Sequence, residues 1–399
     1  MSLLSHWLKR GSALRPEAVK TSLTGPLMAY YQTGRPIWTP RDYASLAREG
    51  FQTNAIVYRA VRMVAEAAAS VPLLLYEGDH EQADHPLLSL LLHPNPRDAG
   101  TTLRETLYGN LLIAGNAYLE AVVSGKQIRE LYALRPDRMK VVLGSDGWPQ
   151  AWEYRVGGAV VQFDQTRDPL PPILQFTLYH PLNDHYGLSP MEAAASAIDI
   201  HNAASGWNKA LLDNAARPSG ALVYAGPPGA TLGTEQFERL KAELEASFQG
   251  AANAGRPLLL EGGLDWKPLS MTPKDMDFME AKAAAAREIA LAFGVPPLLL
   301  GLPGDNTYAN FAEANRAFWR QTILPLVRRT ADSIAHWVTP VYGALRIEPD
   351  LDQIAALAVE RDALWTRLEA CSFLTMDEKR QAVGYPPMGA GAAGKGPPA

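Results

Sequence analysis

Apolar residues recur at helical spacing and then in short runs along the region that follows Phe51. The stretch NAIVYRAVRMVAEAAASV, residues 54–71, has apolar residues at helical spacing, and PLLLYEG, residues 72–78, is typical of a strand. A second helix-then-strand unit follows in TTLRETLYGNLLIAGNAYLEAVV, residues 101–123. The pattern predicts a mixed α/β region.

Between Glu130 and about Tyr179 the pattern changes to short apolar runs separated by turn residues, as in AWEYRV and ILQFTLY. This spacing predicts a small β-rich subdomain. A long helix is then expected from Ser189, which stands at the N-cap position with Pro190 as the first helical residue. The run GALVY, residues 220–224, predicts another strand.

The second half of the chain is mostly helical in pattern. TEQFERLKAELEASFQG predicts an amphipathic helix over 234–250, and RPLLLEGGLDWKPL, residues 256–269, predicts a β-hairpin turning at two glycines. A further helix is expected over 274–293. The next helix contains Pro325, which should kink it, and two short helices are expected over 351–383.

The connection AFGVPPLLLGLPGDNTYANFAEANRAFW, residues 292–319, is unusually long for a joint between two helices. Its glycines and prolines permit sharp bends and stiffen its base, and its tip is polar. Two interpretations remain: a projecting functional loop, or an ordinary interhelical loop whose leucines pack inward.

Composition restricts the function. The net charge is −5, the pI is near 5.9 and the mean hydropathy is −0.12, which favours a globular chain and disfavours tight coating of nucleic acid. The single cysteine, Cys371, cannot form an internal disulfide and indicates folding in a reducing compartment. No signal peptide or membrane-spanning run is expected.

No catalytic or metal-binding constellation is apparent. The tail sequence 389–396 lacks the Ser or Thr and the preceding strand of a phosphate-binding P-loop. The acidic triplets at 275–277 and 350–352 fall in expected first turns of helices, where acidic residues favour the helix dipole. We therefore expect no enzymatic activity, no cofactor and no metal.

Three stretches in this order carry a resemblance: NAYLEAV with KQIRELYALRPDRMKVV, then GLSPMEAAASAIDIHNAASGWNKALLDNAARPSGALV, then GRPLLLEGGLDWKPLSMTPKDMDFMEAKAAAAREIALAFGVPPLLLG. Together they resemble the HK97-like portal proteins of tailed bacteriophages, from about residue 45 to residue 385. The resemblance implies an α+β portal fold. It comprises a mixed α/β wing with a small β-rich subdomain, a two-helix stem, a β-hairpin clip, a long kinked helix and a small helical crown.

The resemblance also implies a division of the chain. The expected parts are a wing (51–230), a stem helix (231–250), a clip (251–273), a second stem helix (274–294), a tunnel loop (295–310), a kinked wing helix (311–345) and a crown (346–385). Outside the resemblance, the weakly periodic residues 1–50, punctuated by Pro and Gly, are expected to form an N-terminal arm with little packed structure, and the low-complexity residues 386–399 a disordered tail.

Candidate residues for contact with DNA or partners follow from that division. For the tunnel loop they are Gly301, Leu302, Pro303, Gly304, Asp305, Asn306 and Thr307. For the stem channel they are Lys274, Lys282 and Arg287, and for the clip Arg256, Glu261, Asp265, Trp266 and Lys267. The polar tip of the loop is expected to pass phosphates without binding them tightly, because each phosphate contact adds affinity.

The implied partners are those of a head–tail connector. They are further copies of the chain in a ring, usually of twelve, the major capsid protein, the terminase large subunit, a head–tail adaptor or neck protein, and double-stranded DNA within the channel. No membrane contact is implied. The expected location is the portal vertex of a virion or phage-like particle assembled in the cytoplasm of a host bacterium.

Other interpretations stay open at this point. The particle could be a phage, a defective prophage or a gene transfer agent. A packaging ATPase or nuclease would need a P-loop or a carboxylate cluster, and neither motif is apparent. Another structural component, such as a capsid or adaptor protein, is expected to be β-rich with a long spine helix or much shorter.

Overall fold

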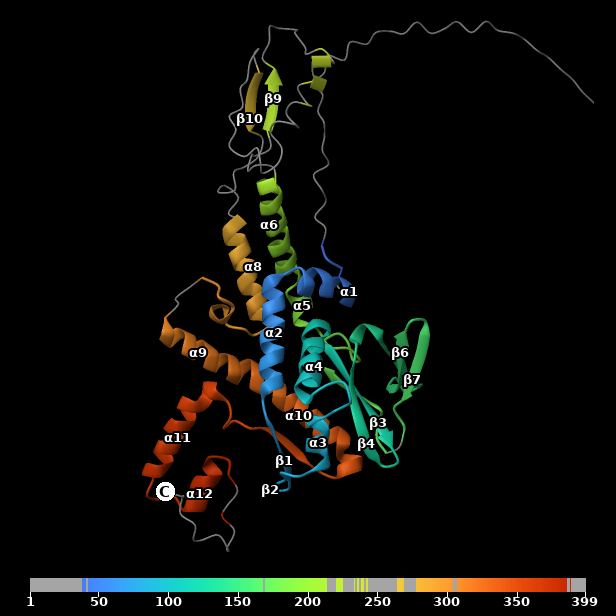
Figure 1. Cartoon of the computed structure of the whole chain (residues 1–399), viewed down its shortest axis with the longest axis vertical. Coiled ribbons are helices and arrows are strands. Elements are labelled where there is room, and N and C mark those ends of the chain that lie inside the picture. Colours follow the sequence, from blue (N-terminus) through green and yellow to red (C-terminus); the bar gives the residue numbers. More distant parts are fainter. Residues whose placement is uncertain are drawn as a thin grey trace, which may run out of the picture. The chain divides into compact units, whose positions relative to one another are not determined.

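A computed structural model describes most of the chain after Ile37. The described residues are 38–40, 42–167, 169–213, 220–224, 233, 235–236, 238–239, 242, 264–268, 278–303, 307–385 and 388. They fall in one unit, Trp38–Ala399 (Figure 1). Most of the expected arm and nearly all of the expected tail lie outside the described residues.

The end of the expected arm is helical and packed, which corrects the expectation of little structure. Helix α1 (Tyr43–Ser45) continues into the π-helical segment η1 (Leu46–Gln52). Leu46 is buried, and the carbonyl of Glu49 accepts a hydrogen bond from the Asn202 side chain at 2.8 Å. A Cβ at Gly50 would lie 2.2 Å from the Met191 methyl carbon, so this segment approaches its neighbour closely.

The first helix-then-strand units form as the apolar pattern predicted. Asn54 caps α2, where its side-chain oxygen accepts from the backbone N–H groups of Ile56 and Val57 at 3.0 and 3.2 Å. This part contains α2 (Ala55–Ser70), β1 (Leu73–Glu77), β2 (His80–Glu81), α3 (Pro86–Leu92), α4 (Gly100–Ala114) and β3 (Asn116–Ser124).

The predicted β-rich subdomain is present and contributes to two three-stranded antiparallel sheets. In one sheet β3 lies between β4 and β8, with Leu119 opposite Ala133 and Ala117 opposite Phe176. The other has the order β5-β6-β7. The bounds are β4 (Gln127–Leu134), the short 3₁₀ turn η2 (Pro136–Arg138), β5 (Met139–Leu143), β6 (Pro149–Val156), β7 (Ala159–Asp164) and β8 (Ile173–Thr177).

Ser189 caps the next helical segment as predicted. Its hydroxyl accepts from the Met191 N–H at 3.0 Å and lies within hydrogen-bond distance of two carbonyls at the end of α4. Helix α5 (Pro190–Ala193) and α6 (Ala195–Asp213) follow, interrupted at Ala194.

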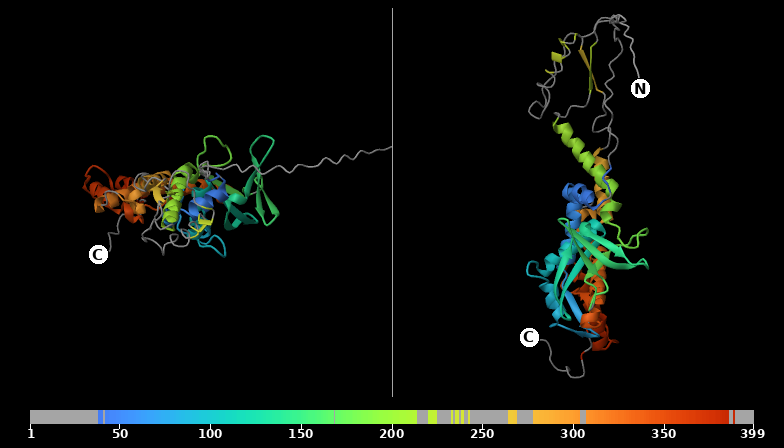
Figure 2. Two further views of the ribbon diagram at one scale, coloured as in Figure 1. Left: turned by 90° about the horizontal axis from the view of Figure 1, so that it is seen from above. Right: turned by 90° about the vertical axis from the view of Figure 1, so that its right-hand side faces the viewer.

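Helix α6 lies beside α8 (Phe278–Ala292), as Figures 1 and 2 show. Buried Ile198 of α6 shares a core cluster with Ala285 and Ile289 of α8. The predicted stem joined residues 274–294 with the helix at 231–250, of which only scattered residues are described, so that pair stays a prediction. Contact between segments so distant in sequence cannot be derived from local periodicity.

The strand β10 (Leu264–Pro268) pairs antiparallel with β9 (Gly220–Tyr224), with Trp266 opposite Leu222. The predicted hairpin paired the β10 segment with residues 256–261 instead, and those residues lie outside the described part. Thus a strand expected in the wing forms a sheet with a strand expected in the clip.

The predicted long helix is present in three parts. Helix α9 (Tyr308–Phe318) continues through a π-helical segment, η5 (Trp319–Ile323), into α10 (Leu324–Tyr342). The π segment ends two residues before Pro325, which lacks an N–H and so cannot make an ordinary intrahelical bond. The helix is therefore irregular in the turn before Pro325, where the sequence predicted a kink at the proline.

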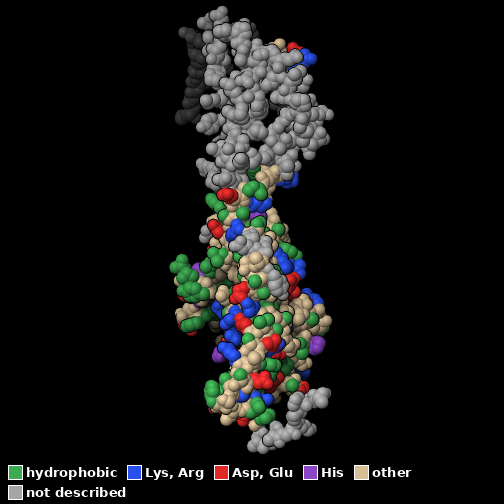
Figure 3. Space-filling view, turned by 90° about the vertical axis from the view of Figure 1, so that its left-hand side faces the viewer, with side chains coloured by type: hydrophobic (Ala, Val, Ile, Leu, Met, Phe, Trp, Pro, Cys, Tyr) green, Lys and Arg blue, Asp and Glu red, His purple; other side chains and the backbone are tan. Residues whose placement is uncertain are grey.

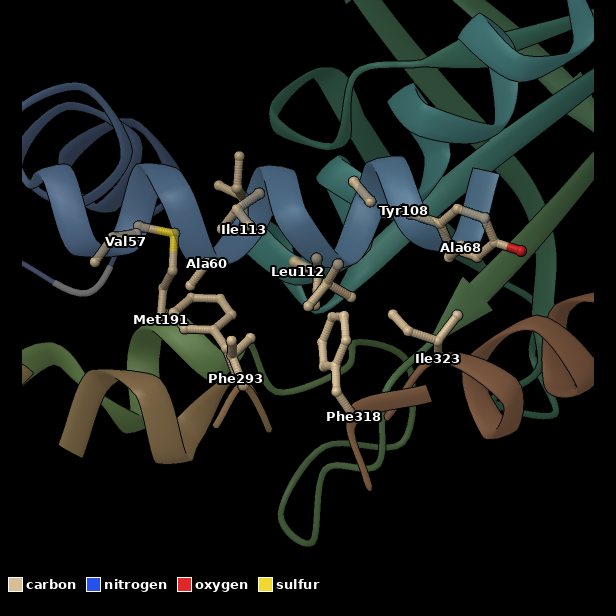
Figure 4. Close-up of a cluster of buried hydrophobic side chains, with 14 of the residues drawn as sticks. Val57, Ala60, Ala68, Tyr108, Leu112, Ile113, Met191, Phe293, Phe318 and Ile323 are labelled. Atoms are coloured by element: carbon tan, nitrogen blue, oxygen red, sulfur yellow. The ribbon is translucent and has the colours of Figure 1, made fainter. Parts of the chain in front are cut away.

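The principal core lies where α2 meets α4, α5, α8 and the long helix. Figure 4 shows Val57 and Ala60 of α2 near Met191 and Phe293, and Phe318 near Leu112 of α4. A second cluster joins α3, α4, β1, β3, β8 and α10, and includes Leu75, Leu111 and Ile347. Ile347 belongs to β11 (Arg346–Pro349), which pairs with β1 although the predicted division placed it in the crown.

The predicted pair of C-terminal helices is present, but its first helix begins at Ala358 rather than at 351, so Asp350 and Asp352 precede it instead of lying in its first turn. The two helices are α11 (Ala358–Ala370), preceded by the 3₁₀ turn η6 (Ala355–Leu357), and α12 (Met376–Ala382). Thr375 and Glu378 form a reciprocal capping box at the start of α12. We call residues 358–385 the crown helices.

Candidate functional site

The loop after α8 starts at a glycine held against the long helix. At Gly294 the backbone has a φ of 64°, and the Thr322 hydroxyl of η5 donates to its carbonyl at 2.6 Å. A Cβ at Gly294 would lie 2.7 Å from that hydroxyl oxygen. The position therefore favours glycine for its backbone conformation and for space.

The next residues of the loop pack inward. Val295 is buried, and Pro297–Leu300 forms one 3₁₀ turn, η4. Leu299 and Leu300 pack against the principal core. The first part of the connection, up to Leu300, thus behaves as an ordinary interhelical loop whose leucines pack inward.

A second anchor lies further along the loop. Gly301 reverses the chain with a φ of 74°, and the guanidinium of Arg287 on α8 donates to the Pro303 carbonyl at 2.6 Å. Gly304, Asp305 and Asn306 lie outside the described residues. The loop ends at Thr307, whose hydroxyl accepts from the Asn310 N–H at 3.2 Å and caps α9.

The three basic residues predicted for the stem have different positions. Arg287 is exposed and holds the loop at Pro303. Lys282 is half-buried beside α6. Burial of the His201 ring, and next the positive charge of Lys282, lower the pKa of this histidine. Lys274 lies outside the described residues.

The predicted clip residues are described only in part. Asp265, Trp266 and Lys267 belong to β10, opposite Val223, Leu222 and Ala221 of β9. Arg256 and Glu261 lie outside the described residues.

Within the described part of the chain, no group of three or more His, Cys, Asp or Glu side chains could hold a metal ion. None of the described helices is both long and apolar enough to cross a membrane.

The sequence analysis missed Thr322, which fixes the start of the loop. Its signal was weak, because the hydroxyl bonds a carbonyl 28 residues earlier in the chain. The helix expected over 274–293 stops just before Gly294, but the contact of Gly294 with Thr322 depends on the packing of α8 against the long helix.

A model of the phage portal protein family matches residues 55–384. The chain belongs to this family. The sequence-based expectation of an HK97-like portal protein, and of the head–tail connector function that goes with it, is thereby confirmed.

Two relatives show how far the similarity extends. A protein of Rickettsia bellii (strain RML369-C) is 43% identical over 343 residues, covering 85% of this chain and 88% of that protein. The portal protein of Enterobacteria phage HK97 is 25% identical over 410 residues, covering 97% of this chain and 89% of that protein.

Solved structures of portal type share the fold. A chain in the neck of an empty gene transfer agent particle is similar with a TM-score of 0.70 and 56% identity, covering 89% of this chain and 96% of that chain. An HK97 family phage portal protein from Corynebacterium diphtheriae has 16% identity and a TM-score of 0.56, covering 82% of this chain and 98% of that chain. The predicted α+β portal fold is confirmed.

Proposed function

We propose that identical copies of this chain close into a ring around a DNA channel at one vertex of a phage-like particle. The observation that carries the proposal is the family match over residues 55–384, supported by similarity to chains of gene transfer agent necks. The neck of a native particle was determined with C12 symmetry, which supports twelve copies. A ring of this kind uses two different surfaces of each copy at every interface.

We place residues 301–307 at the channel. The preceding turn, η4, packs inward, so the loop departs from the core only at Gly301. Its ends are held by Arg287 and by the cap of α9. A loop whose ends are held can keep a narrow opening around a duplex, and its polar, uncharged Thr307 offers no cation to a phosphate.

We assign the stem to α6 and α8, in place of the predicted pair 231–250 and 274–294. These two helices pack along each other, and the segment between them contains the paired strands β9 and β10. That sheet, including Asp265, Trp266 and Lys267, is then the proposed clip. Lys282 would lie inside the stem, since it is half-buried beside α6, rather than on the channel wall.

The proposed partners follow from this architecture. The clip would receive the terminase large subunit during packaging and a head–tail adaptor afterwards, and the wing would contact the major capsid protein. Double-stranded DNA would pass through the ring.

We further propose that the particle is a gene transfer agent. The similarity to gene transfer agent neck chains is 56% in identity, against 25% for the phage HK97 portal protein. Sequencing the DNA inside purified particles tests this: fragments from across the host chromosome support the proposal, and a single phage genome contradicts it.

Imaging of the purified chain by electron microscopy tests the ring. Rings with a central channel are expected, and monomers alone at high protein concentration would contradict the proposal. Replacing residues 301–307 with a short linker should leave rings intact and lower the yield of packaged DNA. The matched control replaces the exposed β5–β6 turn, residues 144–148, and should not change that yield.

A packaging enzyme is the competing function of a different class. The purified chain should show no ATP hydrolysis above that of a heat-denatured sample. Turnover that persists through purification would favour the enzyme instead.

A further inference from the structure

The crown helices leave apolar side chains uncovered. Neither α11 nor α12, both described over their whole length, contains a buried residue. Phe373 in the turn between them is 81% exposed, and Met376 is 62% exposed. A helix of 13 residues is marginal in water without packing, so this density of exposed apolar surface indicates that another surface covers it.

One side of α11 borders an open groove of about 740 Å³. Its apolar lining includes Leu351, Leu357 and Leu364. The edge is polar and predominantly basic, with Arg361 stacked 5.5 Å from the centre of the Trp365 ring. The groove therefore combines an apolar interior with a charged rim, as interface pockets do.

The groove has more basic than acidic side chains in its lining. Arg320 pairs with Glu360 at 3.1 Å, and Arg361 lies 3.9 Å from Asp352. Arg361 also lies 3.6 Å from Asp362, whereas in the described part of the chain no carboxylate pairs with Arg367. The positive charge of Arg367 therefore remains for a partner.

The turn that carries Phe373 has the complementary properties. It is held in place by the capping box, in which the Glu378 N–H donates to the Thr375 hydroxyl at 3.2 Å and Glu378 accepts in return. Asp377 and Glu378 follow Met376 directly, so two acidic groups lie on the C-terminal side of the apolar residues. Asp377 also accepts a hydrogen bond from the Met388 N–H at 2.8 Å. We call Phe373 and Met376 the knob.

We propose that the knob of one copy inserts into the groove of the next copy around the ring. The proposal rests on the ring proposed above, and adds which surfaces join the crowns. A head-to-tail interface needs two different complementary surfaces on one chain, and the crown has both. Acidic Asp377 would then approach basic Arg367, which selects a second copy as the occupant. Figure 3 shows hydrophobic, acidic and basic side chains close together at the lower end of the molecule, where the crown helices lie.

Cross-linking of neighbouring copies tests this contact directly. The background is Cys371→Ser, which removes the single cysteine of the chain, and the test variant adds Phe373→Cys and Ala363→Cys. A short bifunctional maleimide applied to purified rings should give a ladder of covalent dimers, trimers and larger species on a denaturing gel. Each single-cysteine variant should stay monomeric on the gel.

The matched control pairs Phe373→Cys with Ala159→Cys, an equally small exposed residue on β7 of the wing. This control should give no ladder. Rings that form without a ladder from the test pair would overturn the knob-and-groove contact and leave the ring intact. Failure of every variant and of the unmodified chain to form rings would instead overturn the proposed function, and with it this contact.

A charge exchange provides a second readout that does not depend on cross-linking. Arg367→Glu and Asp377→Lys should each raise the protein concentration at which rings dissociate, and combining them should restore much of the loss. If the double variant loses as much ring stability as the two single variants added together, the proposed pairing of Arg367 with Asp377 is contradicted.

Discussion

The proposed wing and the crown helices differ in how far one chain covers their apolar side chains. In the wing, α2, α4 and α10 bury residues such as Val57 and Leu111 among other parts of the same chain. In the crown, the residues described for α11 and α12 include none that is buried. This contrast fits the proposed contact between copies: one copy covers the apolar residues of the proposed wing, and a neighbouring copy would cover those of the crown helices.

The base of the loop after α8, residues 294–303, is held mainly by hydrogen bonds rather than by a buried core. Gly294 and Pro303 are fixed by single polar contacts from Thr322 and Arg287, while Leu299 and Leu300 add partial burial. These few hydrogen bonds position the loop without a large core. We therefore expect its stability to lie between that of the proposed wing and that of the crown helices.

The largest effect is expected from a cavity in the wing. Leu111 is 1% exposed, so Leu111→Ala should lower the free energy of unfolding by about 2–5 kcal/mol. Denaturant titration at a protein concentration that keeps the chain monomeric measures the loss. The same truncation at exposed Leu182 is the control and should have little effect. Similar losses at the two sites would contradict the comparison.

A smaller loss is expected where two wing segments cross. Gly115 has a φ of 70°, and a Cβ there would lie 2.4 Å from the Gly187 carbonyl oxygen. Gly115→Ala should cost about 1–2 kcal/mol for the left-handed conformation, and more for the clash with backbone. Gly125→Ala separates the two causes, because Gly125 has a φ of 65° and nothing within 4 Å of the added carbon. Equal unfolding midpoints for the two variants would exclude the clash.

Local pattern was sufficient for much of this fold. The helix at 55–70 and the caps at Ser189 and Gly294 follow from residues close together in sequence, and so they were predictable. The family resemblance then supplied the function. The partner of α8 and that of β10 were not predictable, because both pairings join segments that are far apart in sequence.

The candidate site was predictable to a similar extent. The sequence indicated a loop that bends at Gly301, and it selected Arg287 as a basic residue of the stem. The cap that Thr307 forms on α9 was not predicted. The hydrogen bond from Arg287 to the Pro303 carbonyl was not predicted, because the partner of a side chain across a turn depends on tertiary packing.

An intermediate effect is expected at the loop base. Thr322→Val removes the hydroxyl that donates to Gly294 and should cost about 1 kcal/mol of unfolding free energy. It should also speed amide hydrogen exchange over residues 294–303. Thr339→Val is the matched control, since the Thr339 hydroxyl donates to the Ala335 carbonyl of its own helix. Unchanged exchange in the loop would show that Thr322 does not hold it.

The smallest effect on a single copy is expected at the knob. Phe373 is 81% exposed, so Phe373→Ala should change the unfolding free energy of the monomer by less than about 0.5 kcal/mol. In rings the same side chain would be covered, and its loss should lower the thermal midpoint of assembled protein, because assembly stabilises the folded state by mass action. Trp148→Ala, at a 73% exposed residue of the wing, should change neither quantity. If a neighbouring copy covers Phe373, the substitution should destabilise the ring and leave the monomer unchanged. Equal destabilisation of the monomer and the ring would show that Phe373 packs within its own chain.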